Sequence, residues 1–528
     1  MDQYHIYWGE SHDNTYQFPS ATENIEEVLR RASTHLDFYA AAYYTAYASA
    51  FREGGHQSDQ ESSAEIILEG WKDQNKLDRE WQEVQAATAK LNAPGKFITF
   101  PGYEWQGDGS GGDHNVFALQ EGLPIFRVDA LPELYEALRG HDALAIPHHT
   151  AYRAGRRGRD WSVYDPELTP FTEVYSVHGC SETDEEWIGL RNNFYMGPGF
   201  GGGTYQDALD RGHHVGAVCS TDNWGDMPGC YGNGTMAVLA TGLTRRELWD
   251  AFKNRRVYGV TGDRIKLEFK INGHGMGSVI TAGGKRDIEI EVEGADAIDR
   301  IEVLRNGRVI HTHCHQGTWD LPQPGRESRF KMKIEAGWGP RKEELDLPDR
   351  EWNGKVQVQN GRMVGFMPCW ISGGQGPVEV KNGRADFTMR STGAAVKNRH
   401  QNGIVFEFSA DITDTLNVGL NGLSVQESVA ECARKSRELW YKDECVRMLS
   451  ELADIPPGSP EREDVYHMYA YKAKLHRAIP ESGYTARVSL QDDAPLEGEA
   501  NYRVRVEQRN GQRAWSSPIW VKNENMSF

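Results

Sequence analysis

The hydrophobic pattern changes its period near residue 264, and this change restricts the folds that the chain can adopt. Before it, short apolar runs such as residues 96–105 and 142–150 alternate with helical stretches such as residues 131–140. Strands and helices in alternation, with polar residues at the strand ends, are the pattern of an α/β barrel. After it, runs such as residues 265–273 alternate apolar with polar residues, and two of the runs contain Asn-Gly hairpin signals. This second pattern predicts an antiparallel β-sandwich.

A chain of 528 residues is too long for one core, so two or three domains are expected. The predicted class is α/β, with a barrel followed by an antiparallel β-sandwich that carries a helical insert. Within the insert, helices are expected at about 424–452 and 461–478. The predicted domains are a metal-binding barrel at 1–264, a β-sandwich at 265–423, the helical insert at 424–478 and closing strands of the β-domain at 479–528.

Charge and composition argue against several classes of partner. The chain has 58 Lys and Arg against 77 Asp and Glu, a net charge of −19, which disfavours nucleic acid and anionic membranes but permits a small anionic substrate. No apolar run approaches the roughly 18 residues of a membrane span, and no signal peptide is visible. The seven cysteines are scattered and indicate reduced thiols. We expect a cytoplasmic protein that acts on a small molecule, and the sequence leaves a homo-oligomer open.

Polar residues gather at the expected carboxyl ends of the strands in the first half. In a barrel these ends meet at one face, where active sites lie. Two or more imidazoles with a shared carboxylate are a typical ligand set for Zn, Mn or Fe. Any one of these residues alone is more often structural, but several at equivalent positions predict a metal site. They are His12, Glu104, His148, His149, His178 and Asp222.

Four arginines directly follow the pair of histidines. In a chain of net charge −19, such a group suggests a clamp for an oxyanion. The alternative is a solvated loop whose arginines pair with local acids. The sequence leaves both interpretations open for Arg153, Arg156, Arg157 and Arg159.

At these same residues the chain resembles the PHP superfamily (polymerase and histidinol phosphatase). The resemblance is strongest to a long, poorly characterised branch with a C-terminal β-domain. The matching stretches stand in the family's order: YWGESH, FPGYEW, GGDHNVFAL, IPHHT, FTEVYSVHGCSE, GAVCSTDNW, RRVYGVTGDRI and AWSSPIWV. The resemblance implies a distorted (β/α)7 barrel that binds up to three metals.

Carried over residue by residue, the resemblance implies particular roles. His12 matches a ligand of the first motif, and Glu104 matches a carboxylate that bridges two metals. One histidine of the 148/149 pair, with His178, matches the ligands of a second metal, and Asp222 matches the acid of the last motif.

Several ligand positions of the family are changed in this chain. Asn14 stands in place of a histidine, Tyr43 and Tyr44 stand in place of two further ligands, and Trp224 replaces the last histidine. We therefore expect one or two divalent ions, Mn, Zn or Fe. Asp13 or a water could fill the gap at Asn14.

These expectations lead to three hypotheses. In the first, the protein is a phosphoesterase-like, metal-dependent hydrolase in which a metal-activated water attacks an anionic or ester-type small molecule. In the second, a metal-dependent lyase or isomerase uses tyrosine as acid or base, unless the two aromatic rings only fill the vacated volume. In the third, a degenerate barrel binds partners without turnover. The residues expected to act in catalysis are Glu104, His149, His114, Arg157 and, in the second hypothesis, Tyr44.

Overall fold

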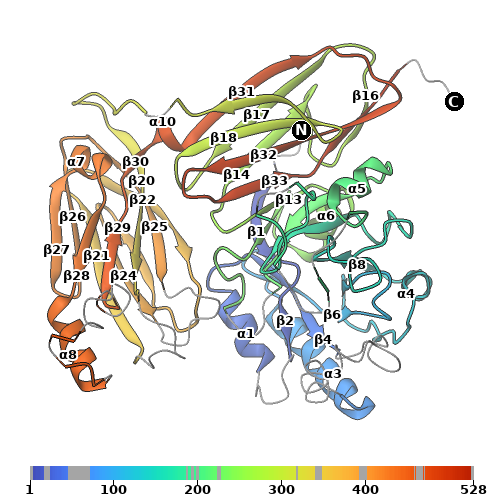
Figure 1. Ribbon diagram of the computed structural model, residues 1–528, viewed down its shortest axis with the longest axis horizontal. Coiled ribbons are helices and arrows are strands. Elements are labelled where there is room, and N and C mark those ends of the chain that lie inside the picture. Colours follow the sequence, from blue (N-terminus) through green and yellow to red (C-terminus); the bar gives the residue numbers. More distant parts are fainter. Residues whose placement is uncertain are drawn as a thin grey trace.

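The computed structural model describes residues 4–16, 24–45, 72–185, 188–191, 196–197, 201–222, 227–316, 319–338, 348–391, 401–452, 454–456, 458–459, 468 and 470–524. Within them the chain is rich in strands and poor in helices, which confirms the predicted mixed α/β class. Figure 1 shows three groups of elements: an α/β part from the first half of the chain, a layer of long strands above it, and a stack of strands to the left. None of the described helices has the length and apolar character needed to cross a lipid bilayer.

Three sheets build the α/β part. One follows the order β5-β3-β1-β12-β13, formed by Ile98–Phe100, Phe38–Ala40, His5–Glu10, Thr235–Ala240 and Val257–Val260. Another follows β2-β4-β6-β7-β8, formed by Asn14–Thr15, Ala42–Tyr44, Gly102–Trp105, His114–Ala118 and Ala143–Pro147. The smallest follows β10-β9-β11, formed by Gly179–Cys180, Phe171–Ser176 and Gly216–Cys219.

Helices pack on these sheets, and two apolar cores are formed. The outer core lies between the second sheet and the helices α1 (Ile25–Ala32), α3 (Gln74–Leu91) and α4 (Leu131–Leu138). The inner core joins side chains of all three sheets to α6 (Arg245–Lys253). Because successive residues of a strand point to opposite faces, one strand can serve both cores.

Antiparallel pairings interrupt the regular repeat of a (β/α)7 barrel. Strand β7 runs antiparallel to both β6 and β8, and β12 runs antiparallel to both β1 and β13. Parallel pairing is present between β1 and β3, β3 and β5, β4 and β6, and β9 and β11. Antiparallel neighbours need no crossover helix, which explains why helices are few. The mixed α/β class is therefore established, and the closed barrel stays a prediction.

The layer above the α/β part consists of two sheets that share one apolar core. The first sheet continues from β13 into β33 (Arg513–Ser516), which pairs antiparallel with it. Beyond β33 it contains β32 (Glu499–Gln508), β34 (Ile519–Lys522), β16 (Val279–Thr281), β18 (Ile298–Arg305) and β19 (Arg308–Cys314). The opposing sheet follows β15-β14-β17-β31, formed by His274–Gly275, Lys266–Ile271, Arg286–Glu293 and Thr485–Asp492.

The stack of strands at the left of Figure 1 has its own core, which includes Phe330, Trp352 and Phe406. One sheet follows β22-β25-β20-β29-β28, formed by Arg362–Cys369, Asn402–Ala410, Ser328–Ala336, Lys472–Leu475 and Arg437–Trp440, with β30 (Ile479–Pro480) beside β20. The other follows β23-β24-β21-β26-β27, formed by Val378–Lys381, Arg384–Ser391, Arg350–Val358, Thr415–Leu420 and Leu423–Ser428.

The antiparallel strands predicted after residue 264 are present, but their apolar residues form two main cores where the sequence predicts a single sandwich. The segment 424–478 contains helices α7 (Val429–Arg434) and α8 (Lys442–Leu452), and strand β28 between them. The helix predicted at 461–478 is wrong for β29, because Ala473 and Leu475 point inward at every second position. Residues 460–467 and 469 lie outside the described part, and the domain boundaries stay predictions.

Candidate metal centre

The carboxyl ends of several strands bring imidazole and carboxylate side chains together in the α/β part. Each of the six residues predicted as metal ligands lies at this place, and each is at most 3% exposed. His12 follows β1, Glu104 lies on β6, His148 and His149 follow β8, His178 follows β9, and Asp222 follows β11. The structure therefore gathers all six at one buried position.

Strand alternation explains why these side chains face inward. On β6, Tyr103 and Trp105 pack in the outer core, so Glu104 between them points to the inner side. On β8, Ile146 packs in the inner core, and His148 continues the same face two residues later. His149 could not share that face in an extended chain. It has a φ of 37°, and this left-handed turn allows two consecutive histidines to reach the cluster.

The ligand atoms form four groups of three residues, and neighbouring groups share one residue. His148 joins the first group to the second, His149 the second to the third, Asp222 the third to the fourth, and His12 the fourth to the first. The four groups thus form a closed ring of eight residues. They are His12–Glu104–His148, Asp113–His148–His149, His149–His178–Asp222 and His12–Glu173–Asp222.

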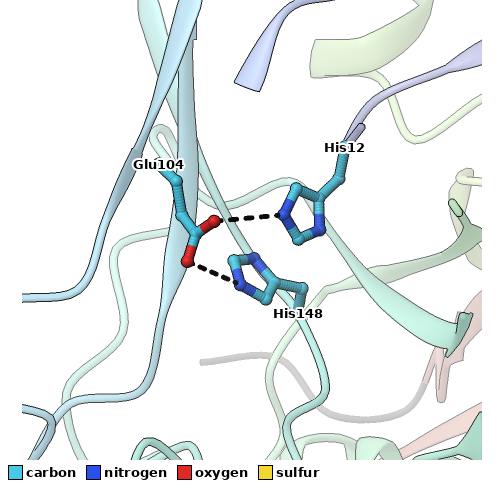
Figure 2. A group of neighbouring side chains, drawn as sticks. All are labelled: His12, Glu104 and His148. Carbon is cyan, nitrogen blue, oxygen red and sulfur yellow. Dashed lines mark ion pairs between the residues drawn. The ribbon is translucent and has the colours of Figure 1, made fainter. Parts of the chain in front are cut away.

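Figure 2 shows the first group, in which the Glu104 carboxylate faces two neighbouring imidazoles, with one oxygen toward each ring. Its Oε2 is 3.7 Å from His12 Nε2, and its Oε1 is 3.8 Å from His148 Nε2. On the opposite side of the ring, His178 Nε2 is 3.1 Å from Asp222 Oδ2. Two donor atoms that each lie about 2.1 Å from one ion are about 3.0–3.4 Å apart, so these separations need only small adjustments.

The hydrogen-bond inventory supports a cation at this position. Buried polar atoms are normally bonded. Among the described residues, His12 Nε2, Glu104 Oε2, His149 Nδ1 and both ring nitrogens of His148 are buried without a hydrogen-bond partner. A divalent cation would satisfy such convergent donor atoms, and imidazole with carboxylate is a suitable donor set. The residues present therefore fit a divalent metal ion.

Neighbouring groups orient two of the imidazoles. His12 Nδ1 is 3.2 Å from Glu173 Oε2, and His178 Nδ1 is 2.8 Å from the Tyr152 hydroxyl. These contacts leave Nε2 of each ring to point into the cluster. Metal-bound histidines are commonly held in this way through their second nitrogen.

The electrostatics of the cluster differ from one histidine to the next. Burial lowers the pKa of His12, but Asp222, Glu104 and Glu173 outweigh burial and raise it well above its ordinary value. Burial and the neighbouring His12 and His149 hold the pKa of His148 well below its ordinary value. The neighbouring carboxylates therefore favour the protonated form of His12, whereas burial and the adjacent imidazoles favour the neutral form of His148.

The sequence pattern does not identify two of the ring residues, Asp113 and Glu173. Glu173 lies two residues after Phe171 on β9, and Phe171 packs in the inner core. An acidic residue within a buried apolar strand was the available signal. Asp113 comes directly before β7, next to the histidine that was singled out. Its Oδ2 is 3.4 Å from His149 Nε2 and also pairs with Arg157.

Arg157 is the arginine of the predicted clamp that reaches the cluster. Its Nη2 is 3.3 Å from Glu104 Oε1, and its side chain is 12% exposed. It has a φ of 69°, a conformation that costs about 1–3 kcal/mol in a residue other than glycine. Arg159 is buried elsewhere and donates to the carbonyls of Gly111 and Asp160. Arg153 is exposed and Arg156 is partly exposed. A clamp of four arginines is therefore not what the structure contains.

His114 lies on the opposite face of its strand from the cluster. It pairs with Trp105 across β6 and β7, whereas Asn115 pairs with Glu104. Its ring contacts Trp105 and Tyr135, and its Nδ1 bonds to a backbone carbonyl. Burial lowers its pKa well below the ordinary value. This placement does not support the predicted role of His114 in orienting the substrate.

The tyrosines of β4 do not fill a vacated metal site together. Tyr43 packs in the outer core, and its hydroxyl donates to Glu80 at 2.8 Å. Tyr44 pairs with Glu104 across β4 and β6, and its carbonyl accepts from Lys72. The catalytic role of Tyr44 stays a prediction.

The gap at Asn14 is not filled by its neighbour. Asp13 Oδ2 accepts from the Tyr39 hydroxyl at 2.8 Å. Asn14 itself donates to Asp222 Oδ1 at 3.2 Å, so it positions a ring carboxylate. Trp224 lies outside the described residues.

Comparisons with known proteins find similarity to proteins described as uncharacterized or of unknown function. A profile described as "Protein of unknown function (DUF3604)" matches residues 8–126 and 199–276. An uncharacterized protein of Chlamydia pneumoniae is 27% identical over 333 residues, which cover 58% of this chain and 48% of that protein. One of Chlamydia trachomatis is 26% identical over 396 residues, covering 70% and 57%. The chain thus spans about half the length of the curated relatives it matches.

One solved structure is distantly similar. It is a two-domain protein from Bacteroides vulgatus described as containing a predicted PHP-like metal-dependent phosphoesterase. It is 11% identical, with a TM-score of 0.32, and the match covers 81% of this chain and 96% of that one. A likeness of this degree adds nothing to the argument from the site.

Proposed function

We propose that the protein is a metal-dependent hydrolase that acts on a small anionic or ester-type substrate with one or two divalent ions. The observation that carries the proposal is the closed ring of four buried ligand groups. Groups opposite each other in the ring share no residue, so two ions can be held by separate groups. Two opposite groups suit this best, namely His12–Glu104–His148 and His149–His178–Asp222. The carboxylates of the other two groups already have partners, since Glu173 contacts His12 and Asp113 pairs with Arg157.

A divalent ion held there would lower the pKa of a water from 15.7 to about 7 and polarise a phosphoryl or carbonyl oxygen. The protein's own residues prepare the position. Glu173 and Tyr152 orient the imidazoles of His12 and His178. The lowered pKa of His148 favours the neutral form that a metal ligand needs. The raised pKa of His12 means that a metal ion would compete with a proton for this ring.

Arg157 is the residue that we expect to bind the substrate. Its guanidinium is the partly exposed cation beside Glu104, and it pairs with Asp113. A guanidinium offers two parallel donors, which suit the oxygens of a phosphate or carboxylate. An anionic substrate oxygen would compete with Asp113 for these donors and gain stabilisation as negative charge develops.

The first experiment measures metal by elemental analysis in protein purified without added metal or a His tag. We expect one or two equivalents of Mn, Zn or Fe, lost in Glu104→Gln. Glu80→Gln is the matched control, because this carboxylate lies on α3 beside Tyr43. Protein that stays free of metal after Mn and Zn are offered would refute the proposal.

Substrate panels then identify the reaction. Aryl phosphates, carboxyl esters and carbamates are compared, each with the wild type, Glu104→Gln and Arg157→Lys. Turnover that depends on Glu104 in any one panel supports a hydrolase and names its class. A metal-loaded protein that cleaves none of them would leave the metal-dependent lyase or isomerase as the better account.

Two finer features of this proposal rest on the resemblance seen in the sequence, namely a distorted (β/α)7 barrel of the PHP type and a phosphoester as the default substrate. Side chains of all three sheets share one inner core, which is compatible with such a barrel. A cytoplasmic location rests on the scattered cysteines and the sequence pattern, and a homo-oligomer is left open.

A further inference from the structure

A pocket of about 600 Å³ lies where the three parts of the fold meet. Its wall is formed by β20 and β25, by the segment after β29, by the turn between β32 and β33, and by Tyr231 of the loop between β11 and β12. Within the described part of the chain, none of the ring residues lines it. Its volume is typical of small-molecule sites, which span about 300–1,000 Å³.

Two charged residues of β20 form one wall of the pocket. Lys333 and Glu335 occupy alternate positions and therefore face the same side of the strand. Lys333 Nζ is 2.6 Å from Glu335 Oε1, and Glu335 Oε2 is 2.6 Å from His476 Nε2. One carboxylate thus serves two basic side chains.

Tyr231 is fixed from behind by a buried carboxylate. Its hydroxyl donates to Asp263 Oδ1 at 2.7 Å, and Asp263 Oδ2 accepts from Gln508 and Asn510 at 2.6 and 2.7 Å. Because the hydroxyl proton is used on Asp263, the oxygen accepts from Lys333 Nζ at 3.3 Å. The ammonium group also lies 4.5 Å from the centre of the Tyr231 ring. The charged wall is therefore arranged before any ligand arrives, which lowers the cost of binding.

A glycine keeps this wall accessible. Gly403 pairs with Glu335 across β20 and β25 and itself lines the pocket. A Cβ at this position would lie 3.1 Å from both Lys333 Cε and Glu335 Cγ. A side chain at 403 would thus press on the two charged residues. Glycine within a strand often marks a place where a ligand approaches closely.

We propose that this pocket binds a small organic anion through a carboxylate or phosphate group. Basic side chains outnumber acidic ones on its wall, although the whole chain has a net charge of −19. Arg477 is exposed at the rim, where its guanidinium can bind two oxygens of such a group. The basic lining residues are Lys333, His476, Arg477 and Arg509, and the acidic ones are Asp296 and Glu335.

Isothermal titration calorimetry at low ionic strength tests the proposal on the full chain. The probes are citrate, glucose 6-phosphate and neutral glucose. We expect one of the anions to bind and glucose not to bind, and the anion that binds distinguishes carboxylate from phosphate recognition. Binding of neither anion would overturn the proposal.

Two pairs of variants locate the binding. Gly403→Val and Arg477→Glu should each weaken the anion at least tenfold. Gly365→Val is the control for the first, because a side chain on that neighbouring strand meets open space. Arg487→Glu is the control for the second, with the same change of charge at a side chain that is 81% exposed.

Circular dichroism checks the fold of each variant, and Arg477→Glu decides alone if Gly403→Val does not fold. If the folded pocket variants bind the anion with the affinity of the wild type, the proposal is overturned, because the anion then binds at another position. Glu104→Gln should bind the anion as the wild type does. Failure of the hydrolase proposal is thereby separated from failure of this one.

Discussion

Replacing Glu182 by glutamine should destabilise the protein by about 3–5 kcal/mol. Glu182 is fully buried shortly after β10, and His178 lies on the other side of this short strand, between β9 and β10. Its carboxylate accepts from Arg505 Nε and Trp515 Nε1, both at 2.7 Å, and pairs with Arg503, which is 1% exposed. Glu182→Gln leaves the Arg503 guanidinium buried without this carboxylate. Removal of one partner from a buried ion pair costs about 3–5 kcal/mol.

The pKa of Glu182 gives a second route to the magnitude. Burial alone would raise this pKa, but Arg503 and Arg505 lower it from 4.5 to about 2. The difference corresponds to about 3 kcal/mol of stabilisation by the ionised form. Because the pKa is lower in the folded state, this stabilisation is complete above the unfolded pKa of 4.5. It is lost as the pH falls from 4.5 through 2.

Urea unfolding of both proteins tests this, followed by tryptophan fluorescence and circular dichroism. The difference between wild type and Glu182→Gln should be constant from pH 6 to 8 and shrink below pH 4.5. Glu302→Gln is the matched control, because its carboxylate also contacts Arg505 but is 14% exposed; it should cost less than about 1 kcal/mol.

A double variant separates the ion pair from simple packing loss. Glu182→Gln combined with Arg503→Met removes both charges, so it should be more stable than Glu182→Gln alone. A cost below about 1 kcal/mol for Glu182→Gln at pH 7 would refute the reasoning. So would a double variant that is less stable than the single one.

Two further predictions concern Tyr152, which contacts the cluster, and Tyr43, which packs in the outer core. Tyr152→Phe removes the hydroxyl that orients His178 and should weaken metal binding about 10–100-fold, measured by competition with a chelator. Tyr164→Phe is the control, because the Tyr164 hydroxyl donates to the carbonyl of His214. Equal metal affinities in the two variants would contradict the role of Tyr152. Tyr43→Phe loses only the bond to Glu80 and should cost about 1 kcal/mol in urea unfolding with unchanged metal content, and a loss of metal would show that Tyr43 does serve the cluster.

The placement of the six expected ligands could be predicted from the sequence because it depends on local patterns. An apolar strand followed by a polar residue, as in the run that ends at His148, identifies both the strand and its end. Asp113 and Glu173 joined them only through the three-dimensional arrangement. The pairing of Trp105 with His114 depends on the register between two strands, and no local pattern encodes it. The sequence pattern therefore cannot show which face of β7 carries His114.

The same limit applies to charged residues and to the β-structure. Arg157 and Arg159 stand two positions apart in one basic stretch, yet Arg157 reaches the cluster and Arg159 is buried against backbone carbonyls. A turn with a positive φ at Arg157 separates them. Alternation after residue 264 predicted strands correctly, but it could not show which strands share a core.

The sheet that joins β13 to β33 affects how the chain can fold during synthesis. Strand β13 ends at Val260, and β33 begins at Arg513. A ribosome that adds about 5–20 residues per second needs roughly 10–50 s to make the chain between them. During that time the α/β part has an unpaired strand edge at β13, and Glu182 is without Arg503. Nascent chains of this protein should therefore depend on chaperones until the last strands emerge, and its refolding from denaturant should be slow because these contacts are far apart in sequence.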